Sequence, residues 1–412
     1  MSEFESRLGA ERVDGTVGVA GGGPPELAVL SERTVVHVIA PVEVGGAESV
    51  VRGLAAGRHR LGGRTEVAVL LERPDSHPLV DDLRQAGVPV HVVCRGHRRY
   101  RAQIRELTEV LARSGARVVH THVYHANFVG YWAARRCRKP VVATFHGFLG
   151  GGWKHRAYER LDWLHLRRFQ AVVCVSDQVR ERLIRSGCER SRLVTVPNGQ
   201  SGTGPLPREV AREVLGIPQG RPALGWVGRL SREKGPDLFL RAMTHVGAEG
   251  AVAVLVGGGE EEARLVDLIA SLGLRRGSVR LVGQRTDAGS LLGAFDVLTI
   301  TSRTEGLPMV LLEAMAAGTP VVAFAVGGVP QVITKESGWL VEPGDVSALG
   351  GALTEALRDR AEAARRAAAA RRVLQERFCA DRWVAQVEAV YEQAERSMGA
   401  VTHRQGGWSR EG

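Results

Sequence analysis

The sequence has little that would tie it to a membrane span, a disulfide framework or a zinc site. No run of about 18 apolar residues occurs, which argues against a membrane-spanning helix, and the N-terminus lacks the apolar core of a signal peptide. The five cysteines are scattered and form no CxxC pair, and Cys94 and Cys174 lie in apolar strand-like runs. This pattern is typical of reduced, buried thiols. We therefore expect a cytoplasmic protein.

Common nucleotide signatures are also missing. No GxxxxGK[ST] loop is present, which argues against a Walker-type phosphate site. Gly257-Gly258-Gly259 follows an apolar run but lacks the GxGxxG spacing, and no acidic residue ends the next expected strand at 279–282. An NAD-dependent oxidoreductase is thereby disfavoured. No aromatic-basic nucleic-acid module is recognisable, so we expect no nucleic-acid partner.

What is present is an ordinary globular composition with an uneven charge. The 412 residues are 44% apolar and 24% charged, with a formal net charge of +10. Residues 31–205 hold 28 basic and 15 acidic side chains, whereas residues 206–412 hold 25 of each. The basic excess therefore lies in one half of the chain, which is either an ordinary solvated surface or a region that meets an anionic molecule or membrane.

Short β-branched runs alternate with helical patterns along most of the chain. In the first half these runs are 35–39, 67–71, 90–93, 118–120, 141–144, 172–175 and 193–196. In the second half they are 223–227, 251–256, 279–282, 297–300 and 321–323. Near-continuous apolar strands between helices indicate parallel sheets that are covered on both faces. The expected fold class is α/β, with two doubly wound sheets.

Clusters of proline and glycine suggest the boundaries of these two units. We expect a flexible tail at 1–32, α/β domains at 33–200 and 221–378 with a linker at 201–220, a final helix at 379–397 and a second tail at 398–412.

In the first half, candidate ligand-binding residues follow the expected strands, because open parallel sheets bind ligands at the carboxyl ends of their strands. Gly45 and Gly46 open a helix, where backbone N–H groups attract anions. His146 ends the fifth run beside a glycine-rich loop and is suited to hydrogen bonding or proton transfer. A structural histidine is the alternative there, and a structural role is the interpretation we favour for His120 and His122.

The second half carries more charged candidates. Arg229 and Lys234 bracket a tight loop after the run 223–227, a combination that suits a diphosphate, although a solvated loop is the alternative. Glu305 lies in a strand-to-helix turn whose free N–H groups also point to a ligand. Glu313 stands among apolar residues within the following helix, where a buried carboxylate needs hydrogen-bond donors such as sugar hydroxyls. Two unrelated surface glutamates are the alternative.

In this order, the motifs resemble those of the retaining glycosyltransferases of family 4, which have the GT-B fold of two facing Rossmann-like domains. The resemblance extends from Gly45 to Pro330 and includes Glu305 and Glu313 at the family's E-x7-E spacing. It departs from the family pattern at Gln200-Ser201, at Gly257–Glu260 and at Gln331.

The resemblance implies a role for each matching residue. Arg229 and Lys234 would neutralise the donor diphosphate, Glu313 would bind the ribose, and His146 would lie beside the sugar and the acceptor hydroxyl. Glu305 would bind the donor sugar. The expected catalytic residues are thus His146, Glu305, Arg229 and Lys234. The expected donor-binding residues are Gly45, Gly46, Arg229, Lys234, Gly257, Glu305, Gly306, Leu307, Pro308, Met309, Val310 and Glu313.

The resemblance also implies retention of anomeric configuration, and the absence of any DxD motif favours transfer without a metal or cofactor. The donor would be a nucleotide-diphosphate sugar, a UDP-sugar by preference, bound by the C-terminal domain. The helix 379–397 would cross back to the N-terminal acceptor domain. The acceptor would be a hydroxyl of a glycan, a lipid-linked sugar or a small natural product. Two alternatives are a sugar-nucleotide 2-epimerase of the same fold and a non-catalytic sugar-nucleotide-binding member.

Two basic segments bear on the acceptor. The segment 95–105 contains five arginines. Helical spacing in 153–169 places Arg156, Arg160, Trp163 and Arg167 on one stripe, which suits an anionic acceptor or the inner face of a membrane. A solvated helix face is the alternative. The sequence gives no oligomeric state.

Overall fold

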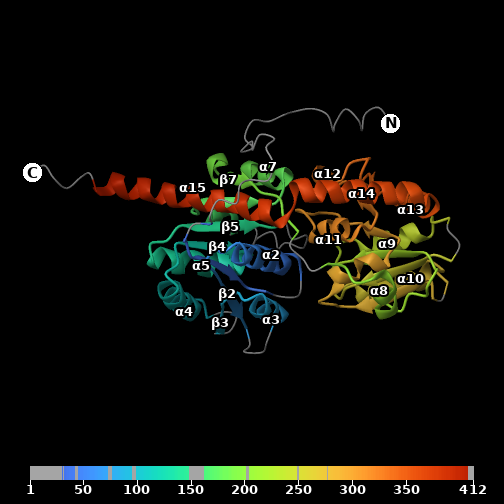
Figure 1. The fold of residues 1–412 in the computed structure, drawn as a ribbon, viewed down its shortest axis with the longest axis horizontal. Helices are drawn as coiled ribbons and strands as arrows, with labels where there is room; N and C mark the ends of the chain where they lie inside the picture. The colour runs from blue at the N-terminus through green and yellow to red at the C-terminus, as the bar shows by residue number, and fades with distance from the viewer. Residues whose placement is uncertain are drawn as a thin grey trace, which may run out of the picture.

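The structure is a computed structural model (Figure 1). It describes residues 30, 32–41, 45–72, 77–94, 99–147, 162–200, 204–247, 250–275 and 277–406. The expected N-terminal tail falls almost wholly outside these residues, as do the last six residues of the chain.

The N-terminal body is built on a seven-stranded parallel sheet with the order β3-β2-β1-β4-β5-β6-β7. Its strands are β1 (Val35–Ile39), β2 (Thr65–Leu71), β3 (Val90–Cys94), β4 (Val118–His122), β5 (Val141–Phe145), β6 (Ala171–Cys174) and β7 (Leu193–Thr195). Most strand residues are buried, as expected for a sheet covered on both faces.

The helices of this body cover the two faces of the sheet. They are α2 (Gly46–Arg60), α3 (Pro78–Gln85), α4 (Tyr100–Arg113), α5 (Tyr124–Arg136) and α7 (Asp177–Arg185), with a 3₁₀ turn η1 (Arg190–Arg192). Helix α2 packs on β1 and β2, while α4 and α5 pack together on the other face. Ser176 caps α7 by accepting a hydrogen bond from the backbone N–H of Val179.

The C-terminal body repeats this design with six parallel strands in the order β10-β9-β8-β11-β12-β13. The strands are β8 (Ala223–Val227), β9 (Val252–Val256), β10 (Val279–Gly283), β11 (Val297–Ile300), β12 (Val321–Phe324) and β13 (Trp339–Val341). The helices are α8 (Arg208–Val214), α9 (Pro236–Met243), α10 (Glu262–Ser271), η2 (Ala288–Ala294), α11 (Met309–Ala317), α12 (Val329–Val332), α13 (Val346–Arg358) and α14 (Arg360–Arg377). All twelve expected strands are found, and β13 is an additional short one.

Two expected boundaries are wrong. The range 201–220 was expected to be a linker, but it contains α8, which packs on η2. The buried Arg212 guanidinium donates to the Ala294 carbonyl at 3.1 Å, which fixes α8 to the C-terminal body. The range 398–412 was expected to be a tail, yet helix α15 (Ala380–Gly406) continues to residue 406, because no proline interrupts the helical sequence there.

Helix α15 belongs to the N-terminal body by its contacts, although it follows the C-terminal body in sequence (Figure 1). It packs against α2 and against β4, β5 and β6. Glu388 on α15 accepts hydrogen bonds from Arg33 at 2.8 Å and from Arg58 at 2.5 Å, and Arg58 is only 2% exposed. Removing one partner of such a buried ion pair leaves an uncompensated charge, so this contact fixes the helix in place.

The two bodies also meet directly beside the carboxyl ends of their strands. The Asn198 side-chain amide donates to the Leu307 carbonyl at 3.0 Å, and Gln331 donates to Asp177 at 3.2 Å. Helix α2 of the first body touches α11 of the second. None of the helices in the described part of the chain combines the length and the apolar character needed to cross a bilayer.

Candidate functional site

The strand order reverses at one point in each sheet, between β1 and β4 and between β8 and β11. Loops leave the carboxyl ends of such a pair in opposite directions and open a crevice between them. In the C-terminal body this switch point holds Lys234 after β8 and Glu305 after β11. The Lys234 ammonium lies 2.6 Å from a Glu305 carboxylate oxygen, which also accepts a hydrogen bond from Ser302 at 2.6 Å. Two residues predicted from the sequence are therefore brought together.

Arg229 lies on the same loop as Lys234 but is held much more loosely. Its side chain is 46% exposed, and the nearest carboxylate oxygen, on Glu233, is 3.6 Å away. An exposed guanidinium with so weak a partner is free to turn toward a phosphate. Two cations of this loop, Arg229 and Lys234, thus each face a glutamate of their own.

Gly257 has a packing role that the sequence did not indicate. A Cβ at this position would overlap the carbonyl oxygen of Gly228, and its φ of +152° favours glycine. The two loops are hydrogen-bonded to each other, with the Leu230 N–H donating to the Gly258 carbonyl at 2.8 Å. The glycine therefore allows the loops after β8 and β9 to lie against each other, and this contact explains it without a ligand.

Glu313, on α11, is the most unusual carboxylate of the site. Burial raises the pKa of its side chain, and the Arg52 cation on α2 opposes that rise. No group in the described part of the chain donates a hydrogen bond to Glu313 or forms an ion pair with it. A Cβ placed on Gly289 of η2 would lie 3.3 Å from its carboxyl carbon, so no larger residue would fit beside it without a shift. The side chain keeps some accessible surface, so its missing donors can come from a ligand in the crevice.

Gly306 and the turn that follows it form the contact with the N-terminal body. A Cβ on Gly306 would overlap the carbonyl oxygen of His146 and lie 2.7 Å from a methyl group of Val175. Pro308 precedes α11, and the first amides of that helix, at Met309 and Val310, have no intrahelical partner. Leu307 is buried, and its carbonyl accepts the Asn198 hydrogen bond described above.

Gly45 and Gly46 open α2 across the interface. In contrast to Gly306, a Cβ on Gly46 would meet nothing within 4 Å among the described residues. Packing in the described part of the chain therefore does not explain this glycine. Gly45 is the N-cap residue, and no side chain caps the helix, so its first N–H groups remain available to an anion.

His146 follows β5 and ends a line of three imidazoles. His37 Nδ1 lies 3.1 Å from His122 Nε2, and His122 Nδ1 lies 3.3 Å from His146 Nε2. Burial lowers the pKa of His37 to about 3 and that of His146 to about 4, and it lowers the pKa of His122 as well. All three rings are therefore neutral at pH 7. Of the three, only His146 retains accessible surface.

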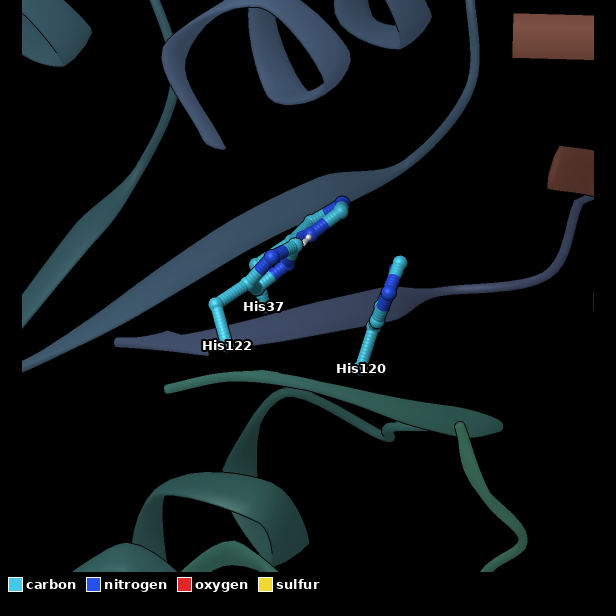
Figure 2. Close-up of side chains that lie close together, drawn as sticks. All are labelled: His37, His120 and His122. Atoms are coloured by element: carbon cyan, nitrogen blue, oxygen red, sulfur yellow. Dashed lines mark hydrogen bonds between the residues drawn. The ribbon is translucent and has the colours of Figure 1, made fainter. Parts of the chain in front are cut away.

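His120 lies beside this line but outside it. Its Nδ1 is 2.7 Å from the Tyr391 hydroxyl on α15, and its Nε2 is 2.7 Å from the Thr144 hydroxyl. Its ring centroid lies 4.3 Å from that of His122 and 5.0 Å from that of His37, so the three rings of Figure 2 form one cluster. These three residues bring nitrogens within 4.8 Å of one another, as metal ligands do. Both nitrogens of His120 and of His122 already have partners, however, so the arrangement suits a hydrogen-bonded cluster better than a cation site.

The sequence indicated some of this site and missed the rest. His122 had been interpreted as structural, yet it contacts His146, while His37 and Arg52 had not been singled out. Period-two alternation was the available signal for the histidines, because residues 120 and 122 of one strand must share a face.

The basic segments are only partly described. Arg156 and Arg160 lie outside the described residues, and Arg167 donates to the Ser186 carbonyl at 2.7 Å. A pocket at the beginning of α4 and in α5 is lined by arginines and aromatic rings, namely Arg99, Tyr100, Arg101, Phe128, Trp132 and Arg136, together with Ala102 and Ile104.

Comparison with known protein families gives matches in both bodies. The model described as "Glycosyl transferase 4-like domain" matches residues 45–199, and the one described as "Glycosyl transferases group 1" matches residues 207–373. The D-inositol 3-phosphate glycosyltransferase of Xylanimonas cellulosilytica is 32% identical over 300 residues, 67% of this chain and 72% of the relative. The 2-deoxystreptamine N-acetyl-D-glucosaminyltransferase of Streptomyces fradiae is 32% identical over 266 residues, 62% of either chain.

Solved structures share the architecture. The Anabaena protein HepE in complex with UDP-glucose superposes with a TM-score of 0.73 at 22% identity, covering 89% of this chain and 99% of that one. Sucrose-phosphate synthase from Thermosynechococcus elongatus gives 0.72 at 22% identity, covering 89% and 100%. These likenesses show the two-body fold.

Proposed function

The chain belongs to the group 1 glycosyltransferases of family 4, with the GT-B fold, and from this membership we propose that it transfers a sugar from a UDP-sugar to an acceptor hydroxyl with retention of anomeric configuration. HepE, which shares the fold, was crystallised with UDP and with UDP-glucose, which makes uridine the preferred base. The N-acetylglucosaminyl relative adds UDP-N-acetylglucosamine as a second donor to try.

One observation carries this proposal: the partly buried Glu313 carboxylate has no donor in the described chain, and it lies one helix turn and a half beyond the turn that holds Glu305. The two hydroxyls of a ribose would supply the missing hydrogen bonds. The diphosphate would then reach the loop after β8, where Arg229 is exposed and Lys234 has a single carboxylate partner. Glu305, freed from Lys234, would bind the sugar hydroxyls.

The proposed chemistry needs charge stabilisation at the leaving group. The bond between the anomeric carbon and the diphosphate oxygen breaks, and negative charge grows on that oxygen. Lys234, the open N-terminus of α2 at Gly45–Gly46, and Arg229 once it has turned toward the phosphate stabilise this charge as donors. The acceptor oxygen forms the new bond on the same face of the sugar, and its proton goes to the departing phosphate. No metal-binding step is needed in this scheme.

For the acceptor we propose a small polyhydroxylated ring. The names of the relatives include 2-deoxystreptamine and D-inositol 3-phosphate, which are both carbocycles with several hydroxyls. The pocket lined by Arg99, Arg101 and Arg136 lies between the beginning of α4, which follows the carboxyl end of β3, and the second half of α5. Its charge favours a phosphorylated acceptor over a cationic one.

The test is a transfer assay on the full chain. Radiolabelled UDP-glucose and UDP-N-acetylglucosamine, with GDP-, ADP- and dTDP-sugars as controls, are incubated with inositol phosphate or with 2-deoxystreptamine. Transfer from a UDP-sugar, with slow hydrolysis when no acceptor is added, is the expected result. Formation of an epimer of the donor, or tight UDP binding without turnover of any donor, would contradict the proposal.

A further inference from the structure

The hydrogen bonds in the line of imidazoles from His37 to His146 all run from donor to acceptor in one direction, and the two ends of the line determine which direction that is. His37 is fully buried, and its Nε2 has no hydrogen-bond partner. At the other end, His146 retains accessible surface, and no described residue hydrogen-bonds its Nδ1. Between these ends, two hydrogen bonds join three rings.

Counting protons gives two arrangements. Three neutral imidazoles carry three N–H protons, and two of these occupy the two hydrogen bonds between the rings. The third proton must lie at one end, on His37 Nε2 or on His146 Nδ1. The first choice buries an N–H donor without an acceptor, which is rarely seen in proteins and destabilises the folded state. The second choice places the N–H where a ligand or water can accept it.

The surroundings of His37 keep its ring neutral, as the proton count assumes. Burial and the positive charge of the Arg58 guanidinium both disfavour a second proton on the ring. Arg58 is itself held in place by Glu388 and by the Arg33 carbonyl, so this charge is fixed.

We propose that His37 and His122 are positioning residues that hold His146 in the Nδ1–H tautomer, so that it donates a hydrogen bond from Nδ1 to a ligand oxygen in the crevice. In this arrangement His37 Nδ1–H donates to His122 Nε2, and His122 Nδ1–H donates to His146 Nε2. His146 then acts as a donor and not as a general base from its open nitrogen. This role rests on the proposed function only for the identity of the ligand, a sugar or an acceptor oxygen.

The line also fits the strand order of the fold. His37 and His120 pair in register on β1 and β4, and His122 and Thr144 pair on β4 and β5. All of them point to the face covered by α2 and α15, where Tyr391 meets His120. His120 is thus a matched comparison for His122: same residue type, same strand and same burial, but bonded to Tyr391 and Thr144 instead of to His146.

The experiment is long-range ¹H–¹⁵N correlation NMR on the full chain labelled with ¹⁵N-histidine, which reports the tautomer of each ring without substrate. His146 is assigned by its loss in His146→Phe. The expected result is Nδ1–H with an unprotonated Nε2 at His146. An Nε2–H tautomer at His146 in the wild type would overturn the proposal, and His146→Phe serves only to assign the signal.

Two substitutions at His122 sharpen the test. His122→Asn keeps an amide where Nδ1 was, so the His146 tautomer should persist. His122→Gln places its amide toward His37 and removes the donor to His146, so His146 should become a tautomer mixture and kcat for transfer should fall at least fivefold. His120→Asn should leave the His146 signal unchanged, whatever it does to Tm. An equal change in His120→Asn and His122→Gln would show a merely structural role.

The outcomes separate this proposal from the proposed function. If the wild-type tautomer is as expected but no donor is turned over, the transferase assignment fails and the hydrogen-bond direction stands. If transfer occurs with His146 in the Nε2–H form, the positioning role fails and the transferase assignment stands.

Discussion

The two switch points of this molecule have opposite chemistry. Between β8 and β11, the Lys234 ammonium and the Glu305 carboxylate are both charged and paired. Between β1 and β4, His37 and His122 are buried, neutral and joined by a hydrogen bond. The difference agrees with the division of work that we propose: the C-terminal body offers charges to a charged group, and the N-terminal body offers an oriented neutral donor at His146.

The largest effect on transfer should come from removing the charged pair of Lys234 and Glu305. Glu305→Gln removes the carboxylate that holds both Lys234 and Ser302, and it weakens the contact proposed for the donor sugar. We expect kcat/KM for transfer to fall about 100- to 1000-fold, with the fold unchanged by circular dichroism. Asp287→Asn, which breaks the exposed pair with Arg285 in the same body, is the control and should have little effect. Full kcat/KM in Glu305→Gln would show that the site is misassigned.

The next largest effect should be a difference between the two bodies in how their stability depends on pH. The pKa of His146 in the folded state is about 4, below its ordinary value of 6.5, so the unfolded chain binds protons first as the pH falls. The stability is complete above pH 6.5 and falls toward pH 4, by about 3 kcal/mol for His146 alone. His37 and His165 add to the effect in the same body.

Hydrogen exchange at pH 7 and pH 5 is the measurement for this acid effect. Protection should be lost in β1, β4 and β5 before it is lost in β8, β9 and β11. Equal loss in both sheets would contradict the assignment of buried neutral histidines to the N-terminal body.

Glu313→Gln should change stability and ligand binding in opposite directions. Desolvation raises the pKa of this partly buried carboxylate, so the folded state disfavours its charge at pH 7, and the neutral amide should raise Tm. Loss of charged hydrogen bonds to the ribose, about 1.5–3 kcal/mol, should weaken UDP binding about tenfold to hundredfold. A thermal scan with and without UDP measures both. If Tm falls and UDP binding is unchanged, Glu313 has a structural role.

The smallest effects concern two glycines on opposite sides of the interface. Gly306→Ala places a methyl group against the His146 carbonyl. It should lower the free energy of unfolding by about 1–3 kcal/mol, and kcat should fall with it. The methyl group of Gly46→Ala meets open space, so the free energy of unfolding should change by less than about 0.5 kcal/mol. The KM for the donor should rise. An unchanged donor KM in Gly46→Ala would remove the open end of α2 from the proposed site.

Much of the fold could be predicted because both sheets are buried on both faces. The apolar runs at 35–39, 223–227 and 297–300 coincide with β1, β8 and β11. The short strand β13 was missed, and α8 was missed because prolines and glycines flank it.

The site could be predicted where charged residues lie in a loop after a strand, and less well elsewhere. Lys234 and Glu305 follow their strands directly and were expected together. The link between His37 and His122 depends on β1 lying beside β4, an order that no local pattern indicates. Gly257 looked like a ligand residue because a close approach of a ligand and a close approach of another loop require the same residue type.

The most direct test of this division of work is the Kd of UDP, measured by isothermal titration calorimetry on three proteins. Relative to the wild type, Glu313→Gln should weaken UDP binding at least about tenfold, because its contacts are to the nucleotide. His146→Phe should leave the Kd within about twofold, because its contacts are to the sugar or the acceptor. If His146→Phe weakens UDP binding as strongly as Glu313→Gln, or if Glu313→Gln leaves the Kd unchanged, the two bodies do not divide the work in this way.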